Sequence, residues 1–285
     1  MSIQFKNLSY EYSPDTPFAY LALKNINLTI RENKMTAIVG ATGSGKSTLV
    51  QHLNALLVPT SGELVVDDKV IYSDKKNTGL KALREKVGLV FQFPEAQLFE
   101  ETILKDVMFG PLNFKKTEDE AKALATQALE LVNIDRELYN QSPLELSGGQ
   151  KRRVAIAGIL ALNPDILVCD EPTAGLDPQG QIQIMELFDR FKEQDDKSVI
   201  LVTHDLQDVL DYADDVVVMA HGEVIFHDTK EAFFNRTDLL SEIQNVLPKV
   251  IQFREALNKK GFNISDSVTD LEQLVYEIMK EIDHE

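Results

Sequence analysis

Short runs of consecutive apolar residues recur along the chain and predict strands buried on both faces, as in a parallel sheet. These runs are Met35 to Val39, Ile166 to Cys169, Val199 to Val202 and Val216 to Met219. Apolar and polar residues alternate instead in Ile3 to Tyr12 and in Gly62 to Tyr72, which predicts half-exposed strands in an antiparallel side layer. Both patterns together predict an α/β fold with a buried sheet at its centre.

Helical patterns lie between these strands. Ser47 to Leu57 is predicted as the helix after the first buried strand, and Pro94 to Pro143 is helical in pattern. Within this stretch, Thr117-Glu118-Asp119-Glu120 supplies a capping box before a helix over Ala121 to Val132. The chain therefore predicts a helical subdomain over about residues 93–150.

The pattern changes after residue 220. A hairpin is expected around His221-Gly222, followed by amphipathic helices over Pro248 to Lys260 and Val268 to Ile282, with Gly261 between them. The apolar stripe of the last helix is predicted to contain Val268, Leu271, Val275, Ile278 and Ile282. We therefore expect a main domain, residues 1–220, and a C-terminal appendage, residues 221–285.

The composition is that of a soluble globular protein, with 285 residues and 44% hydrophobic content. No run approaches the roughly 20 apolar residues of a membrane-spanning helix, and the first residues lack the apolar core of a signal peptide. The chain is therefore expected in the cytoplasm unless a partner holds it at a membrane.

Charge and cysteine content narrow the possible functions. The formal net charge of −17 argues against a nucleic-acid partner, although Lys151-Arg152-Arg153 is a candidate for a local basic stripe. The single cysteine, Cys169, excludes an internal disulfide and a cysteine-based zinc cluster. Its apolar neighbours predict a small buried side chain instead of a reactive thiol.

A glycine-rich loop joins the first buried strand to its helix. This loop and the next residue comprise Gly40, Ala41, Thr42, Gly43, Ser44, Gly45, Lys46, Ser47 and Thr48. A strand, a glycine loop and a helix in this order are the context of a phosphate-binding loop, whose backbone surrounds the β-phosphate. The Lys46 ammonium is expected between the β- and γ-phosphates, and the Ser47 hydroxyl on Mg²⁺. The alternative is a glycine-rich turn that matches by chance.

Polar side chains end two other buried strands. Asp170 is expected to hold Mg²⁺ directly or through water, and Glu171 to orient or deprotonate the attacking water. His204 is expected near the γ-phosphate, because ligands of open α/β sheets collect at the carboxyl ends of the strands. The alternatives are solvated loop charges and, for His204 and Asp205, a structural histidine beside a helix cap.

A second glycine-rich turn, Leu146-Ser147-Gly148-Gly149-Gln150, also opens a helix. With the phosphate loop, it resembles the motif set of ATP-binding-cassette (ABC) ATPases over about residues 1–220. The other members of the set are Gln92, Asp170-Glu171, Leu176-Asp177 and His204. The resemblance implies a P-loop NTPase fold of ABC type with a mixed sheet core, an antiparallel β side layer, a helical subdomain and a small C-terminal helical appendage. It also implies ATP and Mg²⁺ as cofactors.

Further roles follow from the same resemblance. Ser147, Gly148 and Gly149, with Gln150 in the motif, grip the γ-phosphate of ATP bound to the opposite subunit. Gln92 contacts Mg²⁺ and starts a loop that senses a membrane partner, and Asp177 lies in a loop that connects the two sites.

An aromatic side chain near the N-terminus of such ATPases stacks on adenine. Tyr12 is the best match to the family's pattern. Because Ser13 to Tyr20 has the character of an insertion, Tyr10, Phe18 and Tyr20 remain alternatives.

Three segments narrow the resemblance. They are Phe91 to Phe99, Val107 to Asn113 and Ala174 to Pro178. The first two are similar to ATPases of energy-coupling-factor (ECF) transporters, which import vitamins and metal ions into prokaryotes. The third, with the length of the tail, resembles the second of their two ATPase subunits.

This resemblance implies specific partners at the cytoplasmic face of the cell membrane. They are a second, different ATPase, a shared transmembrane coupling protein and interchangeable membrane-embedded substrate-binding subunits. The tail then contributes to ATPase pairing; the alternative is that it packs only on its own domain. The sequence indicates neither the solute nor whether the partner ATPase is a different chain or a copy.

Other functions fit the sequence less well. The ATPase subunit of another transporter type, such as a cobalt or nickel ECF importer or a conventional importer, is the main alternative. A soluble cassette acting on DNA or ribosomes typically carries coiled-coil arms or two cassettes, and this acidic chain shows neither. A nucleotide-gated protein without turnover would not need Glu171 and His204.

Overall fold

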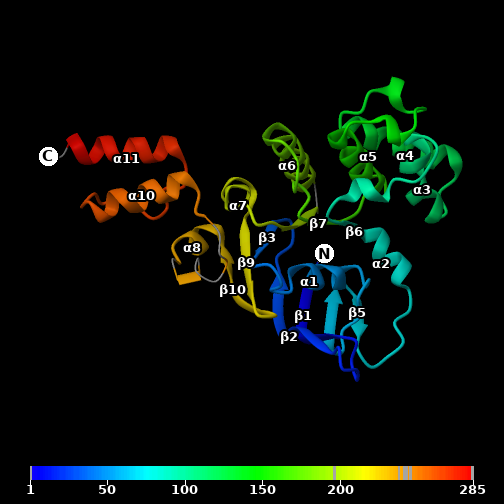
Figure 1. Cartoon of the computed structure of the whole chain (residues 1–285), viewed down its shortest axis with the longest axis horizontal. Coiled ribbons are helices and arrows are strands. Elements are labelled where there is room, and N and C mark those ends of the chain that lie inside the picture. Colours follow the sequence, from blue (N-terminus) through cyan, green and yellow to red (C-terminus); the bar gives the residue numbers. More distant parts are fainter. Residues whose placement is uncertain (1, 195–196, 237, 240–242, 244–245, 284–285) are drawn as a thin grey trace.

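Two sheets with surrounding helices make up the main body, and a pair of helices extends from it (Figure 1). The structure, a computed structural model, describes residues 2–194, 197–236, 238–239, 243 and 246–283. Helices α3, α4 and α5 gather at one end of the body, whereas α10 and α11 project at the opposite end (Figure 1).

The central sheet has six strands in the order β10-β9-β3-β8-β7-β6. Their bounds are β3 Met35–Val39, β6 Val87–Val90, β7 Ile166–Asp170, β8 Ser198–Val202, β9 Asp215–Ala220 and β10 Glu223–Thr229. Neighbouring strands from β6 to β9 run parallel, and β10 is antiparallel to β9 through the predicted turn at His221-Gly222. The mixed sheet core is therefore confirmed, and every residue of β3, β6, β7, β8 and β9 is buried.

The second sheet is antiparallel, with the order β2-β1-β4-β5. Its strands are β1 Ile3–Tyr12, β2 Tyr20–Ile30, β4 Ser61–Val66 and β5 Lys69–Tyr72. The alternating segment from Gly62 to Tyr72 spans two strands, because the chain turns at Asp67, which has a left-handed φ of 56°. The antiparallel side layer is thus confirmed, with one more turn than the pattern indicated.

The helices of the main body lie around the two sheets. They are α1 Lys46–Leu53, α2 Leu80–Lys86, α3 Ile103–Asn113, α4 Glu118–Leu131, α5 Gly148–Leu160, α6 Pro178–Lys192, α7 Leu206–Tyr212 and α8 Lys230–Phe234, with short 3₁₀ turns at Pro94–Gln97, Arg136–Leu138 and Pro143–Glu145. The predicted capping box of Thr117 and Glu120 forms at the start of α4. Helix α1 ends at Leu53, before the predicted Leu57, because Ala55 adopts a left-handed φ of 52°.

Apolar side chains fill both faces of the central sheet. On one face α1 and the antiparallel sheet pack against Ile38, Val168 and Ile200. On the other face the helices α3 to α6 pack against Leu167 and Cys169. Cys169 is fully buried and free, as predicted, and burial raises the pKa of its thiol well above the ordinary value.

The tail consists of α10 Lys249–Lys259 and α11 Leu271–Asp283. Gly261, with a φ of 102°, follows the end of α10 as predicted, but α11 begins after Val268. The predicted stripe is only partly packed within the chain: Val268 is buried and Ile278 packs beside the buried Leu274, whereas Leu271 is 66% and Val275 50% exposed. The reason is that α11 packs through Leu274 and Ile278 onto α10, while the side chain of Ile282 lies outside the described residues.

Among the described residues, none of the helices combines the length and apolar character needed to span a bilayer.

Candidate functional site

Four neighbouring strands bring the predicted site residues to one edge of the central sheet. The strands β3, β8, β7 and β6 are parallel neighbours, so their carboxyl ends lie side by side. Gly40 follows β3, His204 follows β8, Asp170 ends β7 and Gln92 follows β6. This edge is where open α/β sheets place their ligands.

The phosphate loop wraps the start of α1. Gly40 has a φ of 152°, and a Cβ there would lie 2.2 Å from the Met219 carbonyl oxygen, so this position requires glycine. Gly45 caps α1 without a side-chain hydrogen bond, which leaves backbone N–H groups at the helix N-terminus for an anion. The Ser44 hydroxyl is buried without a protein partner among the described residues. These features fit a bound phosphate group.

The Lys46 side chain lies over this loop. Its ammonium donates to the carbonyl oxygens of Gly40, at 2.8 Å, and Ala41, at 3.0 Å. Burial lowers the pKa of Lys46, an effect that the nearby carboxylates of Glu171 and Asp170 oppose. A polyphosphate would supply further negative charge at the same place and stabilise the ammonium.

Oxygen donors suitable for Mg²⁺ meet beside the loop. Burial raises the pKa of the Asp170 carboxyl, and the nearby Ser47 hydroxyl opposes this effect. A cation at this position would favour the charged carboxylate. Hydroxyl and carboxylate oxygens are ligands that Mg²⁺ prefers, so the residues present fit the predicted ion.

Glu171 lies between two other predicted residues. The Gln92 amide donates to its carboxylate at 3.1 Å, and His204 Nδ1 lies 3.7 Å from the same oxygen. The Glu171 backbone has a left-handed φ of 48°, an uncommon conformation for a residue with a side chain, and its N–H donates to the Val202 carbonyl. The strained turn directs the carboxylate toward Gln92 and His204. Asp205, by contrast, caps α7 through the N–H of Gln207.

Two of the predicted aromatic residues contact the phosphate helix α1: Tyr12 contacts Thr48 and Tyr10 contacts His52. The Tyr12 hydroxyl lies 3.2 Å from the Thr48 hydroxyl. Tyr20 lies opposite Tyr12 on the neighbouring strand, while Phe18 is 83% exposed in the loop between them. Tyr10 is half-buried and contacts the core.

The second glycine turn opens α5. Ser147 caps the helix and forms a capping box with Gln150. Apart from its own helix backbone, no atom of the described residues lies within 4 Å of a Cβ built at Gly148, so packing among these residues does not explain the glycine. A groove of about 490 Å³ adjoins the turn. It is lined by Glu95, Ser147, Gly148, Gly149, Arg152, Arg153, Gly175, Leu176, Asp177, Gln179, Gly180 and Gln183.

This groove and the phosphate loop are separate sites within one chain, since the groove includes no phosphate-loop residue. Asp177 borders the groove and caps α6 through the N–H of Gly180 at 2.8 Å. Gly175 adopts a φ of 77°, which favours glycine in this loop.

Arg152 was missed as a candidate site residue and was considered only for a basic stripe. It is 3% exposed, and its guanidinium forms a two-bond ion pair with Glu95 at 2.8 and 2.9 Å. It also donates to the carbonyl oxygens of Pro172 and Ala174. Arg152 therefore connects α5 with the segments that follow Gln92 and Glu171, and it leaves no exposed basic stripe of three residues.

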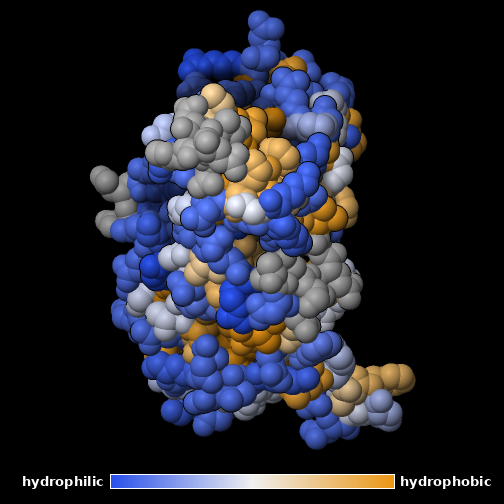
Figure 2. Space-filling model, turned by 90° about the vertical axis from the view of Figure 1, so that its left-hand side faces the viewer, coloured by the Kyte–Doolittle hydropathy of each residue, from blue (hydrophilic) through white to orange (hydrophobic). Residues whose placement is uncertain are grey.

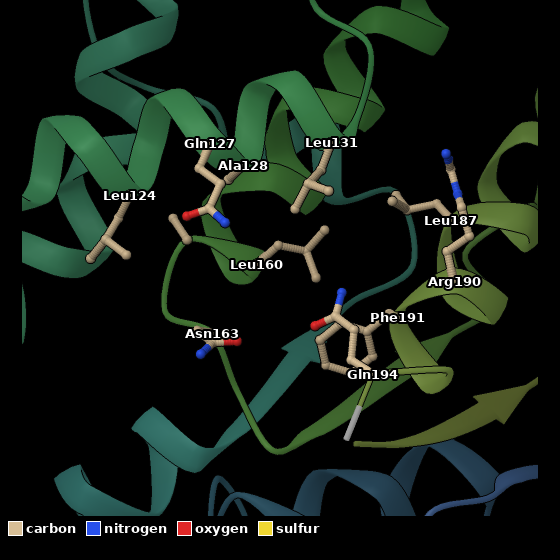
Figure 3. A pocket seen from close by; sticks show the side chains of 11 residues that line it. Leu124, Gln127, Ala128, Leu131, Leu160, Asn163, Leu187, Arg190, Phe191 and Gln194 are labelled. Atoms are coloured by element: carbon tan, nitrogen blue, oxygen red, sulfur yellow. The ribbon is translucent and has the colours of Figure 1, made fainter. Parts of the chain in front are cut away.

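A cavity of about 380 Å³ lies away from these residues, between α4, α5 and α6. Leu131, Leu160 and Phe191 point toward it from the three helices (Figure 3). Its lining includes no predicted site residue, so it is distinct from the proposed nucleotide site.

Comparison with known proteins agrees with this geometry. The family model described as ABC transporter matches residues 23–174. The chain is 48% identical over 282 residues to the energy-coupling factor transporter ATP-binding protein EcfA2 of Enterococcus faecalis, covering 99% of this chain and 98% of the relative. It is 51% identical over 264 residues to EcfA2 of Streptococcus agalactiae serotype Ia, covering 93% and 94%.

Solved structures share the fold. The structure of cbiO1 from Clostridium perfringens, described as part of the ABC transporter complex cbiONQ, has a TM-score of 0.73 and 39% identity, covering 89% of this chain and 98% of that chain. A dimeric post-hydrolysis state of the ATP-binding cassette MJ0796, bound to ADP and Pi, has a TM-score of 0.71 and 35% identity, covering 80% and 98%. The chain is therefore an ABC ATPase and belongs to the family of energy-coupling factor transporter ATP-binding proteins.

Proposed function

We propose that this chain is the ATP-hydrolysing motor of an ECF importer for vitamins or other micronutrients. It works at the cytoplasmic face of the membrane with a second ATPase, a transmembrane coupling protein and interchangeable substrate-binding subunits. The observation that carries the proposal is the contact of Gln92 and His204 with Glu171 at the sheet edge, in a chain similar to EcfA2 proteins over nearly its full length.

The phosphate loop holds the β- and γ-phosphates of ATP in this proposal. Ser47, Asp170 and Gln92 hold Mg²⁺, which supplies charge neutralisation at the phosphates. Glu171 accepts a proton from the attacking water, and Gln92 and His204 orient its carboxylate.

The second glycine-rich turn, Leu146 to Gln150, acts on the ATP of the partner subunit. Two observations support this role: the space beyond Gly148 is open, and the groove beside the turn is separate from the phosphate loop. Backbone N–H groups at the start of α5 favour the negative γ-phosphate there. Asp177, at the rim of the same groove, connects the two sites.

Residues 221–285 form the pairing region in this proposal. Helix α11 exposes the apolar side chains of Leu271, Val275 and Met279, at 66%, 50% and 54%. These positions are four residues apart and lie on one side of the helix. Figure 2, which views the tail end of the molecule, shows apolar surface among polar residues.

Purification of tagged full-length chain from native membranes tests the proposal. We expect a second ATPase and a transmembrane protein to co-purify in stoichiometric amounts. Glu substitution of both Val275 and Met279 is expected to reduce the recovered second ATPase at least about fivefold, because two charges would be desolvated at the interface.

Gln273→Glu is the matched control, since Gln273 is exposed on the same helix. Recovery of the chain without membrane subunits would contradict the importer function. Unchanged ATPase pairing in the double variant would instead contradict only the role of α11.

The segment after Gln92 is the proposed docking site for the coupling protein. Phe93 and Phe99 are 49% and 62% exposed, and Phe99 lies edge-to-face against Phe109 at 4.8 Å. Leu98, by contrast, packs against the buried core between the helices α3 to α6 and the central sheet. Phe99 is therefore the better residue to substitute, since a charge at Leu98 would also disturb the core.

Phe99→Asp is expected to reduce solute uptake by reconstituted vesicles at least about tenfold while leaving MgATP affinity within about twofold. Loss of a buried aromatic contact at a docking site typically costs 2 kcal/mol or more, about 30-fold in affinity. Ile225→Asp serves as a control, because Ile225 is 41% exposed on the distant β10. Normal uptake with a folded Phe99→Asp subunit would rule out the coupling role.

A further inference from the structure

Four residues of β1 and α1 form a closed ring of contacts. The Tyr12 hydroxyl lies 3.2 Å from the Thr48 hydroxyl, and the Thr48 carbonyl oxygen accepts a hydrogen bond from His52 Nδ1 at 2.7 Å. The His52 ring packs edge-to-face on Tyr10 at 4.9 Å, and Tyr10 packs edge-to-face on Tyr12 at 4.8 Å. The ring therefore links the end of β1 to the phosphate helix.

The buried histidine is fixed in one protonation state. His52 is fully buried, and burial lowers its pKa to about 4, so the imidazole is neutral at physiological pH. Because a carbonyl oxygen can only accept, Nδ1 carries the proton. Nε2 is left without a protein partner among the described residues. A buried acceptor without a hydrogen bond lowers the stability of the fold. This cost indicates that the shape of the His52 ring and its Nδ1 hydrogen bond matter at this position.

Tyr12 needs such support because of its place in the chain. It is the last residue of β1 and is 37% exposed. Residues 13–19, which follow it, are all exposed. An exposed aromatic ring at a strand end would lose conformational freedom on stacking against a base, and prior ordering of the ring removes this cost.

We propose that Tyr10 and His52 are positioning residues that hold the Tyr12 ring at a fixed place relative to the phosphate loop, so that adenine and polyphosphate bind together. The proposal rests on the proposed stacking of Tyr12 on adenine. Thr48 fixes the spacing, because it follows Ser47 directly and contacts both Tyr12 and His52. Neither Tyr10 nor His52 contacts the nucleotide itself.

The test compares two probes with the full-length chain by isothermal titration calorimetry: MgATP and magnesium tripolyphosphate, which lacks the base. Tyr10→Leu removes two edge-to-face contacts and His52→Leu removes one, and such pairs are worth about 0.5–1.5 kcal/mol each. We expect each variant to weaken MgATP binding about 2- to 10-fold and to leave tripolyphosphate binding within about 1.5-fold. Tyr72→Leu, in β5 of the same sheet, is the matched control and should change neither affinity.

Equal losses for the two probes would overturn the proposal, because they would indicate general loosening of the phosphate helix. Unchanged MgATP affinity in Tyr10→Leu and His52→Leu would also overturn it. Should His52→Leu fail to fold, Tyr10→Leu at its half-buried strand position decides the matter alone.

Tyr12→Ala separates this proposal from the underlying proposal that Tyr12 stacks on adenine. A selective loss of MgATP affinity in Tyr12→Ala, without one in the Tyr10 and His52 variants, would contradict positioning but keep the stacking role. No selective loss in Tyr12→Ala would contradict stacking itself.

Discussion

Glu171→Gln is expected to lower the steady-state ATPase rate of the assembled transporter by about 100- to 10,000-fold while leaving ATP affinity nearly unchanged. The amide keeps the shape of the carboxylate but cannot accept a proton from water, and general-base catalysis typically contributes a rate factor of this size. The left-handed backbone at Glu171 and its contacts with Gln92 and His204 are compatible with an amide side chain. ATP should then remain bound and hold the paired subunits closed.

ATP turnover by phosphate release and ATP binding by calorimetry check this prediction in parallel. Glu193→Gln is the matched control, because Glu193 is an exposed glutamate at the end of α6. Turnover close to that of the unmodified protein would show that Glu171 is not the base and that water is activated without this carboxylate.

Four of the five fully buried strands were predictable because a strand covered on both faces must be apolar throughout; the fifth, β6, was not predicted and has only four residues, one of them Gly88. Met35–Val39 was predicted with its observed bounds, and the strands ending at Asp170 and Val202 to within one residue of each end. Once parallel strands are known, the site residues that follow them must share an edge, so the meeting of Gly40, Asp170 and His204 was also predictable.

The tail was less predictable because the apolar residues of α11 lie on one broad face, of which only part packs within the chain. Leu274 is buried toward α10, whereas Val275, beside it on the same face, is 50% exposed. The sequence alone does not distinguish a face that packs within the chain from one left for a partner.

Long-range polar contacts could not be read from the sequence either. Arg152 lies between Lys151 and Arg153 and resembles part of a solvated basic run, but it is buried against Glu95, 57 residues away. The sequence feature that could have indicated this ion pair is Glu95, an acidic residue in the mainly apolar segment after Gln92. No sequence pattern indicated a role for His52, because that role depends on contact between His52 in α1 and Tyr10 in β1.

Lys46→Ala is expected to weaken MgATP binding by at least about 30-fold and to abolish measurable turnover. Lys46 is 8% exposed, and its ammonium donates to the carbonyl oxygens of Gly40 and Ala41 in the phosphate loop. Removing one member of a buried, hydrogen-bonded charge pair typically costs 2–5 kcal/mol, and a polyphosphate would be left opposite the carboxylates of Asp170 and Glu171 without this cation.

Calorimetry with MgATP and an ATPase assay of the assembled transporter measure both effects. Lys151→Ala provides the matched control, since Lys151 carries the same charge outside the phosphate loop. The loop backbone should keep its shape in Lys46→Ala, because Gly40 and Gly45 set its turns and the Lys46 side chain only bridges two carbonyls. Binding and turnover within about twofold of the unmodified protein would therefore mean that the N–H groups of α1 bind the phosphates without help from this side chain.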